Sequence, residues 1–231
     1  MNEQASNSVP PSQPFQSPSS PWRIPEWFSD LSLEESRGLK NFFDQLLLVN
    51  RTTSILSPRT LPFVDALHFA DAILASRMIY KDCPSANEWF DLGSGNGIPG
   101  LVFAILFPQT KVHLVDSDAK KSEALSEIVK ALGLKNVDVM NKAIESLAPE
   151  SVKFSMTRGL SSISKTMLSM RKACPPGGRV YHLKGEEWSM EVAQMPTQLC
   201  ALWGPALVGG YKLPIGDFKM SVVRTDRLAV R

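Results

Sequence analysis

A ten-residue stretch rich in glycine holds the residues of this chain best suited to chemistry: Asp91-Leu92-Gly93-Ser94-Gly95-Asn96-Gly97-Ile98-Pro99-Gly100. Apolar residues lie on both sides, Trp89-Phe90 before it and Leu101 to Phe107 after it, which predicts a strand, a glycine turn and a helix. Glycine tolerates positive φ and lets the backbone approach a ligand, while the start of the helix offers free N–H groups. We therefore expect Gly93, Gly95 and Gly97 to contact a nucleotide-like cofactor.

Two acidic residues bear on which cofactor this is. The spacing Gly95-x-Gly97-x-x-Gly100 matches the dinucleotide pattern, and Asp116 stands where an acidic residue contacts a ribose, which suits NAD and S-adenosylmethionine equally. Asp91 favours S-adenosylmethionine, because a carboxylate repels a pyrophosphate but attracts a sulfonium and an ammonium. Ile144 and Glu145 follow a third strand candidate and are expected to meet the adenine.

The elements that must position these residues alternate from Glu88 onward. Apolar runs predict strands at residues 88–92, 111–115, 137–140, 152–157 and 179–184, and helices near 98–107, 119–132 and 162–174. This alternation predicts an α/β fold with a doubly wound, mainly parallel sheet. Two further segments, Ala201–Val208 and Phe218–Arg224, with Gly209-Gly210 between them, predict an antiparallel hairpin at the sheet edge.

Three regions follow from composition and periodicity. Residues 1–24 are rich in Ser and Pro and are expected to be disordered. Residues 25–87 form a helical lead-in: Ser32 and Glu35 make a capping box before the apolar stripe of Phe42 and Phe43, and a second stripe runs from Phe63 to Leu74. Residues 88–231 form the α/β domain.

Composition limits the partners. The net charge of +2 does not by itself indicate a polyanion, although basic residues can gather on one face. Cys83, Cys174 and Cys200 are isolated and odd in number, which indicates a reducing compartment rather than a disulfide framework, and no cluster has metal-ligand spacing. The longest apolar run is too short for a membrane span. We expect a cytoplasmic monomer that binds neither metal nor membrane.

The motifs together resemble one family. The glycine stretch, then Val115-Asp116-Ser117 with Lys120-Lys121, then Thr157-Arg158-Gly159 and finally Leu183-Lys184-Gly185 recur in the order of the bacterial ribosomal RNA small subunit methyltransferase G family, also called glucose-inhibited division protein B. The resemblance covers about residues 31 to 224. His68-x-x-Asp71 also resembles a motif of that family, once an insertion is allowed before it.

The resemblance implies the Rossmann-like sheet of S-adenosylmethionine-dependent methyltransferases, an activity and further residue roles. Members transfer a methyl group to N7 of a guanine in small-subunit ribosomal RNA, so that RNA or the ribosomal subunit would be the partner here. Ile98 would pack near the cofactor, and Arg158 would lie beside cofactor and substrate. Lys184 would hold an RNA phosphate or the guanine O6, and Arg158 and Lys184 are the substrate-positioning candidates, with no certain catalytic residue. The departures from the pattern at Gly159-Leu160-Ser161 leave the RNA site less supported than the cofactor site.

Other classes of function stay open at this point. A methyltransferase acting on a small molecule or a protein, an NAD-dependent oxidoreductase on the same sheet, and an RNA-binding protein without catalysis all fit the fold. Cofactor identity separates the oxidoreductase from the others, and the acceptor of the methyl group separates the rest.

Overall fold

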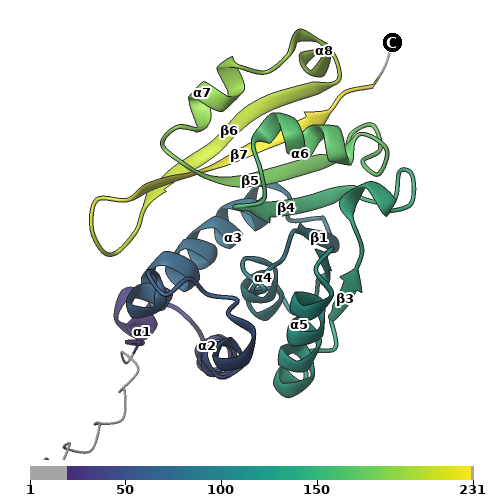
Figure 1. Ribbon diagram of the computed structural model, residues 1–231. Coiled ribbons are helices and arrows are strands. Elements are labelled where there is room, and N and C mark those ends of the chain that lie inside the picture. Colours follow the sequence, from purple (N-terminus) through teal and green to yellow (C-terminus); the bar gives the residue numbers. More distant parts are fainter. Residues whose placement is uncertain (1–19, 230–231) are drawn as a thin grey trace, which may run out of the picture.

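The computed structural model describes residues 20–229 of the 231-residue chain. Its centre is a seven-stranded sheet in the order β3-β2-β1-β4-β5-β7-β6 (Figure 1). The strands are β1 (Glu88–Leu92), β2 (Lys111–Asp116), β3 (Val137–Asn141), β4 (Phe154–Arg158), β5 (Arg179–Gly185), β6 (Trp203–Lys212) and β7 (Lys219–Arg227). Neighbours among β1 to β5 are parallel, and β7 runs antiparallel between β5 and β6. The expected mainly parallel, doubly wound sheet is confirmed.

Helices cover both faces of this sheet. One face carries α1 (Ile24–Trp27), α2 (Leu33–Thr53), α3 (Asp71–Asp82), α4 (Gly100–Leu106) and α5 (Ala119–Leu132), and the other carries α6 (Ile163–Met170), α7 (Trp188–Ala193) and α8 (Thr197–Cys200). The short turns are η1 (Leu61–Phe63), η2 (Asp65–Ala70) and η3 (Ile144–Ser146). Within residues 20–229 no helix is long and apolar enough to cross a membrane.

Alternating side chains of the strands build two separate cores. Trp89 packs with Phe103 of α4 on one face, while its neighbour Phe90 belongs to the core under α6. This is the period of two that a strand imposes. Because both faces are covered by helices, the inner strands are buried on both sides, as parallel sheets require.

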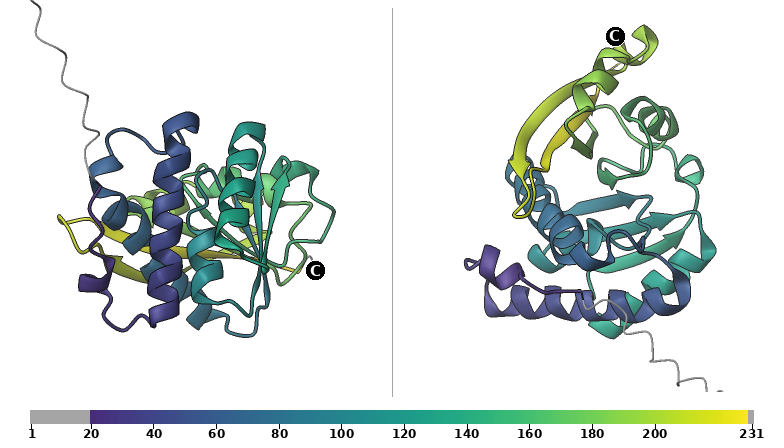
Figure 2. Two further views of the ribbon diagram at one scale, coloured as in Figure 1. Left: turned by 90° about the horizontal axis from the view of Figure 1, so that it is seen from below. Right: turned by 60° about the vertical axis from the view of Figure 1, so that its left-hand side comes forward.

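The N-terminal lead-in packs onto the first of these cores. Ser32 accepts a hydrogen bond from the Glu35 N–H, and Glu35 accepts one from the Ser32 N–H, so the expected capping box is present. Phe42 and Phe43 are buried, as predicted, and α2 runs across α4 and α5 along one side of the molecule (Figure 2). The lead-in therefore adds a layer outside the sheet-covering helices.

The N-terminal boundary lies earlier than expected. The tail expected over residues 1–24 lies outside the described residues as far as residue 19, but residues 20–24 are described. The Arg23 guanidinium pairs with the buried Asp65 at 2.8 Å, and Ile24 is completely buried at the start of α1. Residues 20–24 are therefore ordered, and local composition did not predict this because the Arg23–Asp65 ion pair joins residues 42 positions apart in the sequence.

The second N-terminal stripe was predicted only in part. It divides into the 3-10 turn η1, the π-helical turn η2 and α3, and Phe63 is 44% exposed instead of buried. Both turn types depart from 3.6 residues per turn, so they rotate Phe63 away from the face that a continuous α-helix would bury. The expected ends of two other elements also shift: β4 begins at Phe154, because Val152 bonds to the Ala173 carbonyl, and α6 ends at Met170.

The expected C-terminal hairpin is present, but the two glycines that stood between its expected strands belong to the first of them. Gly209 and Gly210 lie inside β6, next to a bulge after Leu207, and the turn follows Lys212. A Cβ on Gly209 would lie 2.3 Å from the Met78 Cε atom of α3. These glycines therefore allow the strand to lie against α3, a reason that no local pattern reveals.

Candidate functional site

A cavity of about 790 Å³ opens where β1, β2, β3 and β4 end, within the range of about 300–1,000 Å³ that is usual for small-molecule sites. The strand order reverses between β1 and β4, and ligands of doubly wound sheets bind at this switch point. Its wall comes from the loops after four strands, from α6 and from the lead-in. The lining residues are Ile55, Gly93, Ser94, Gly95, Asn96, Ile98, Val115, Asp116, Ser117, Asp118, Lys121, Lys142, Ala143, Ile144, Glu145, Arg158, Gly159, Leu160, Ser161, Lys165 and Ser169.

The glycine turn forms the floor of this cavity. Gly93 and Gly95 line it, whereas Gly97 does not, although all three were expected to touch the cofactor. Gly97 has a φ of +83°, and a Cβ there would lie 2.7 Å from Leu101 Cδ1 and 3.0 Å from Leu125 Cδ2. In this structure Gly97 thus lets the turn pack against α4 and α5.

Asp91 lies beneath the turn rather than in the cavity. Its side chain is 1% exposed, and its Oδ2 atom accepts a hydrogen bond of 3.0 Å from the Gly100 N–H, the first residue of α4. The Oδ1 atom has no partner, and burial raises the pKa of Asp91 to about 7. An N–H at the start of α4, which a pyrophosphate would use, is therefore already bonded to a carboxylate.

Asp116 stands at the end of β2 and joins two loops. Its Oδ2 atom accepts from the Gly95 N–H at 2.8 Å, and its Oδ1 atom accepts from the Asp118 N–H at 2.9 Å. A carboxylate has about four acceptor positions, so each oxygen keeps capacity for a further donor. The side chain lines the cavity, which places a doubly accepting group where a ribose diol could donate.

Apolar and acidic residues face each other across the same cavity. Ile98 and Ile144 are nearly buried and both line the wall, as does Glu145. The Glu145 carboxylate accepts a short hydrogen bond from the Ser169 hydroxyl of α6, which lowers the pKa of Glu145. Ile144 and Glu145, which were expected at the adenine, and Ile98, which was expected near the cofactor, thus line the same cavity.

Arg158, the last residue of β4, is fixed by groups from the lead-in. Its Nη1 atom donates to the Leu67 carbonyl at 3.0 Å and to Asp71 Oδ2 at 3.2 Å, and its Nη2 atom donates to His68 Nδ1 at 2.5 Å. Burial and the Arg158 charge lower the pKa of His68 to about 3, so this imidazole is neutral and accepts. Both ends of the His68-x-x-Asp71 motif thus meet on one guanidinium at the cavity.

Lys184 occupies a different environment from the one its sequence position suggested. Its ammonium donates to both Glu191 carboxylate oxygens at 2.9 Å and to the Ser161 carbonyl at 2.8 Å, and it does not line the cavity. Glu191 also accepts from the Ile163 N–H at 2.8 Å. Lys184 and Glu191 therefore hold the Ser161–Ile163 segment, whose first residue lines the cavity.

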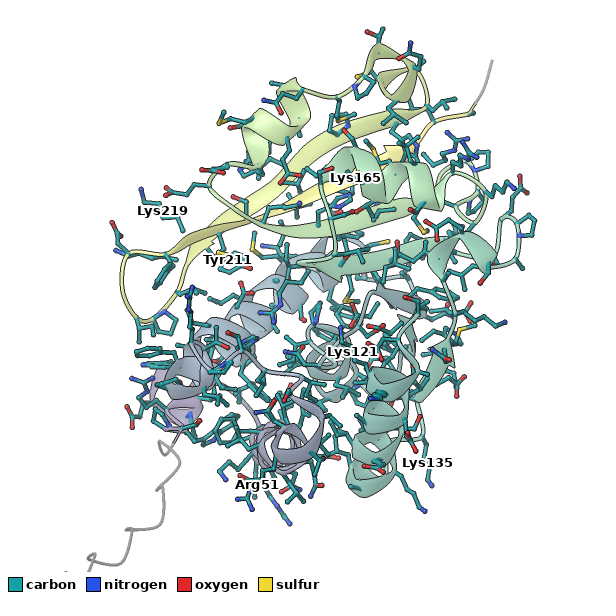
Figure 3. All side chains as sticks on the ribbon, viewed as in Figure 1. Arg51, Lys121, Lys135, Lys165, Tyr211 and Lys219 are labelled. Atoms are coloured by element: carbon teal, nitrogen blue, oxygen red, sulfur yellow. The ribbon has the colours of Figure 1, made fainter. Side chains whose placement is uncertain are left out.

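Several lining residues escaped the sequence reasoning. Ile55 comes from the loop after α2, a segment with no apolar period, and nothing in the sequence places it near β1. Lys142, Lys165 and Ser169 could have been found, because they follow β3 or begin and continue the helix after β4, at the edge where ligands bind. Lys121 of α5 and Lys165 of α6 are exposed and are labelled in Figure 3.

The residues present suit S-adenosylmethionine better than a dinucleotide. The wall offers a carboxylate acceptor at Asp116, apolar surface at Ile98 and Ile144, and backbone at Gly93 and Gly95. These match a diol, a heterocycle and an amino-acid tail, while Asp91 occupies an amide that would bind phosphate. Among residues 20–229 no group of three or more His, Cys, Asp or Glu side chains could hold a metal ion.

Comparison with known sequences gives one consistent family. A family model described as rRNA small subunit methyltransferase G (GidB) matches residues 35–204. Ribosomal RNA small subunit methyltransferase G 3 of Bdellovibrio bacteriovorus is 52% identical over 208 residues, covering 90% of this chain and 94% of that protein. Ribosomal RNA small subunit methyltransferase G of Paracoccus denitrificans is 28% identical over 160 residues, covering 69% of this chain and 81% of that protein.

Comparison with solved structures gives the same fold. A SAM-dependent methyltransferase from Aquifex aeolicus superposes with a TM-score of 0.53 at 15% identity, covering 78% of this chain and 98% of that one. A mutant of the protein MtNAS in complex with S-adenosylmethionine gives a TM-score of 0.57 at 13% identity, covering 89% of this chain and 77% of that one. At these identities the likeness concerns the fold alone.

Proposed function

Because the chain belongs to the ribosomal RNA small subunit methyltransferase G family, we propose that it transfers the methyl group of S-adenosylmethionine to N7 of a guanine in 16S ribosomal RNA. The observation that carries the proposal is the family match over residues 35–204, which includes the whole wall of the cavity at the carboxyl ends of β1 to β4. The cofactor is S-adenosylmethionine, and the enzyme is a methyltransferase of the Rossmann-like type.

Different cavity residues would contact different parts of the cofactor. Asp116 would accept from the ribose hydroxyls, Ile98 and Ile144 would pack on the adenine, and Glu145 would lie at its edge. Gly93 and Gly95 would leave room for the methionine portion. When bound, S-adenosylmethionine supplies a methyl group already activated by its sulfonium.

The reaction requires the protein to position the substrate and the cofactor, and it requires no proton transfer before attack. Guanine N7 carries an in-plane lone pair and no proton, so the protein needs no general base before attack. The protein must hold the acceptor close and in line, at an approach of about 3–3.5 Å. Arg158 keeps donor hydrogens beyond those bound by Leu67, Asp71 and His68, and these can bind an acceptor of the substrate or the cofactor.

Lys184 acts through its neighbours in this proposal. It holds the Ser161 carbonyl and Glu191, and so keeps the loop after β4 closed over the cavity. Leu160 of the same loop lies over Gly93, where a Cβ would be 2.6 Å from Leu160 Cδ1. An apolar side chain in that position excludes water from the methionine end.

The alternative functions find less support. The Gly100 amide bonded to Asp91 argues against the NAD-dependent oxidoreductase, and no observation favours a small molecule or a protein as the acceptor. We propose a cytoplasmic, monomeric enzyme whose partner is small-subunit RNA or the assembled subunit. Light scattering during gel filtration tests the monomer directly.

Labelled methyl transfer tests the activity. The enzyme is incubated with S-adenosylmethionine carrying a labelled methyl group and with 30S subunits, free 16S RNA or 50S subunits as acceptors, and the RNA is digested to nucleosides. Label in 7-methylguanosine from 30S subunits or 16S RNA, and none from 50S subunits, is the expected result. Label in another nucleoside, or none while calorimetry shows cofactor binding, would contradict the proposal.

A further inference from the structure

Helix α3 carries a Tyr–Asp–Arg cluster at each of its two ends. At its start, the Tyr211 hydroxyl of β6 donates to Asp71 Oδ1 at 2.6 Å, and Arg158 donates to the other carboxylate oxygen of Asp71. At its end, the Tyr181 hydroxyl of β5 donates to Asp82 Oδ2 at 2.7 Å, and Arg224 of β7 donates to the same carboxylate. Both clusters join a tyrosine hydroxyl and an arginine to one aspartate, although Asp82 is partly exposed and also pairs with Arg179 at 3.8 Å. Only the first cluster includes a residue that lines the cavity.

We propose that Tyr211 is a positioning residue for methyl transfer: through Asp71 it holds the Arg158 guanidinium in the orientation that faces the cavity. The inference rests on the proposed function, because Arg158 acts there on the substrate or the cofactor. It makes the C-terminal hairpin part of the active site, although β6 is the sheet edge strand that lies farthest from β1 in the sheet order.

Burial explains why Asp71 needs the tyrosine. Asp71 is 1% exposed, so each of its oxygens must find a donor within the protein. Arg158 reaches Oδ2 only, at 3.2 Å, and Tyr211 is the partner of Oδ1. Without the hydroxyl, Oδ1 would be left unpaired in the core, and the carboxylate would turn toward Arg158 to recover a donor. That turn would move the guanidinium.

Arg158 itself has no other charged partner that could keep its orientation. Its remaining contacts among the described residues are the Leu67 carbonyl and the neutral His68, and both come from η2, just before Asp71. The position of the Arg158 guanidinium therefore depends on the position of the start of α3. Figure 3 labels Tyr211 on β6 beside α3, and its hydrogen bond to Asp71 connects the start of that helix to the sheet.

The second cluster supplies a matched control within the same protein. Tyr181→Phe removes the same hydroxyl from the same kind of carboxylate, at the opposite end of α3 and away from the cavity. A purely structural hydroxyl and a positioning hydroxyl would both lower thermal stability when removed. Only the positioning hydroxyl would change the rate of methyl transfer in folded enzyme.

A double-mutant cycle tests whether Tyr211 acts through Arg158. Single-turnover rates of methyl transfer to 30S subunits, and S-adenosylmethionine affinity by calorimetry, are measured for Tyr211→Phe, Arg158→Lys, their combination and Tyr181→Phe. We expect Tyr211→Phe to lower the rate about tenfold, roughly the effect of one hydrogen bond to a charged group. Tyr181→Phe should leave the rate within about twofold, and the combined variant should be no slower than Arg158→Lys alone.

Independent effects would overturn the inference. If Tyr211→Phe and Arg158→Lys multiply in the double variant, or if Tyr211→Phe retains the full rate, the hydroxyl does not act through the arginine. Should Tyr211→Phe fail to fold, Asp71→Asn replaces it in the same cycle with the same two readings. Wild-type enzyme that forms no 7-methylguanosine would instead refute the proposed function, so the two failures are distinguishable.

Discussion

Asp91→Asn should remove a pH dependence of stability that wild type carries. Burial raises the pKa of Asp91 from its ordinary 3.8 to about 7, so between these values the folded state holds a proton that the unfolded state has lost. Stability from this group is therefore complete below the ordinary value and disappears as the pH rises through about 7. From pH 5 to pH 8 the loss amounts to about 3 kcal/mol, at 1.36 kcal/mol for each pH unit below the folded pKa.

Urea unfolding at pH 5, 6, 7 and 8 measures this effect as a difference between wild type and Asp91→Asn. Other groups cancel in the difference, including Asp82, whose pKa is lowered because hydrogen bonds from Arg224 and Tyr181 outweigh its burial. We expect the free energy of unfolding of Asp91→Asn, relative to that of wild type, to rise by about 3 kcal/mol between pH 5 and pH 8. Parallel curves for the two proteins would refute the reasoning, since they would mean that Asp91 is ionised throughout.

Three further predictions concern the cavity. Asp116→Ala should weaken S-adenosylmethionine binding by calorimetry about tenfold or more, because it removes acceptors from both the ribose and the glycine turn; an unchanged affinity would refute the assignment. Gly97→Ala should lower the free energy of unfolding by about 2 kcal/mol or more, because a Cβ at φ +83° would meet Leu101; a thermal melt like that of wild type would contradict this. Lys184→Met and Glu191→Gln should each cost about 1–2 kcal/mol in urea unfolding, after allowance for their partial exposure, and the double variant should be no less stable than the worse single one; additive losses would show that the two side chains act separately.

The parts of the fold that the sequence predicted are those with local signals. β1 has its expected bounds because turn residues flank a short apolar run, and Gly133 ends α5 in the left-handed conformation that its type favours. Asp116 and Ile144, two predicted cofactor residues, were placed at the cavity by the same logic, since Asp116 ends β2 and Ile144 lies in the segment that follows β3.

The parts that the sequence did not predict depend on contacts between distant segments. Gly209 gave no local sign that it lies against Met78 of α3, and nothing near Ile55 in the sequence showed that it lines the cavity. Lys184 shows that a residue can be placed correctly from the sequence while its role is not. Its place at the end of β5 was correct, but Glu191, which decides what its ammonium binds, lies on a helix that no periodicity had predicted.

One long-range feature did leave a trace in the sequence of α3. Asp71 and Asp82 stand eleven positions apart, close to three turns of a helix, so they share the face that also carries Ile79 and Ala75 toward the core. Charged residues on a buried face require partners, because an unpaired carboxylate there would be protonated or exposed. The buried Asp71 and the partly buried Asp82 both meet this requirement, because a tyrosine and an arginine bind each of them in the structure. Asp82 needs its cations the more, since it lies at the negative end of the helix dipole, whereas Asp71 lies inside a helical run that continues back through η2. Asp71 therefore depends less on its arginine than Asp82 does, and Arg158 can bind a ligand while it stays bonded to Asp71.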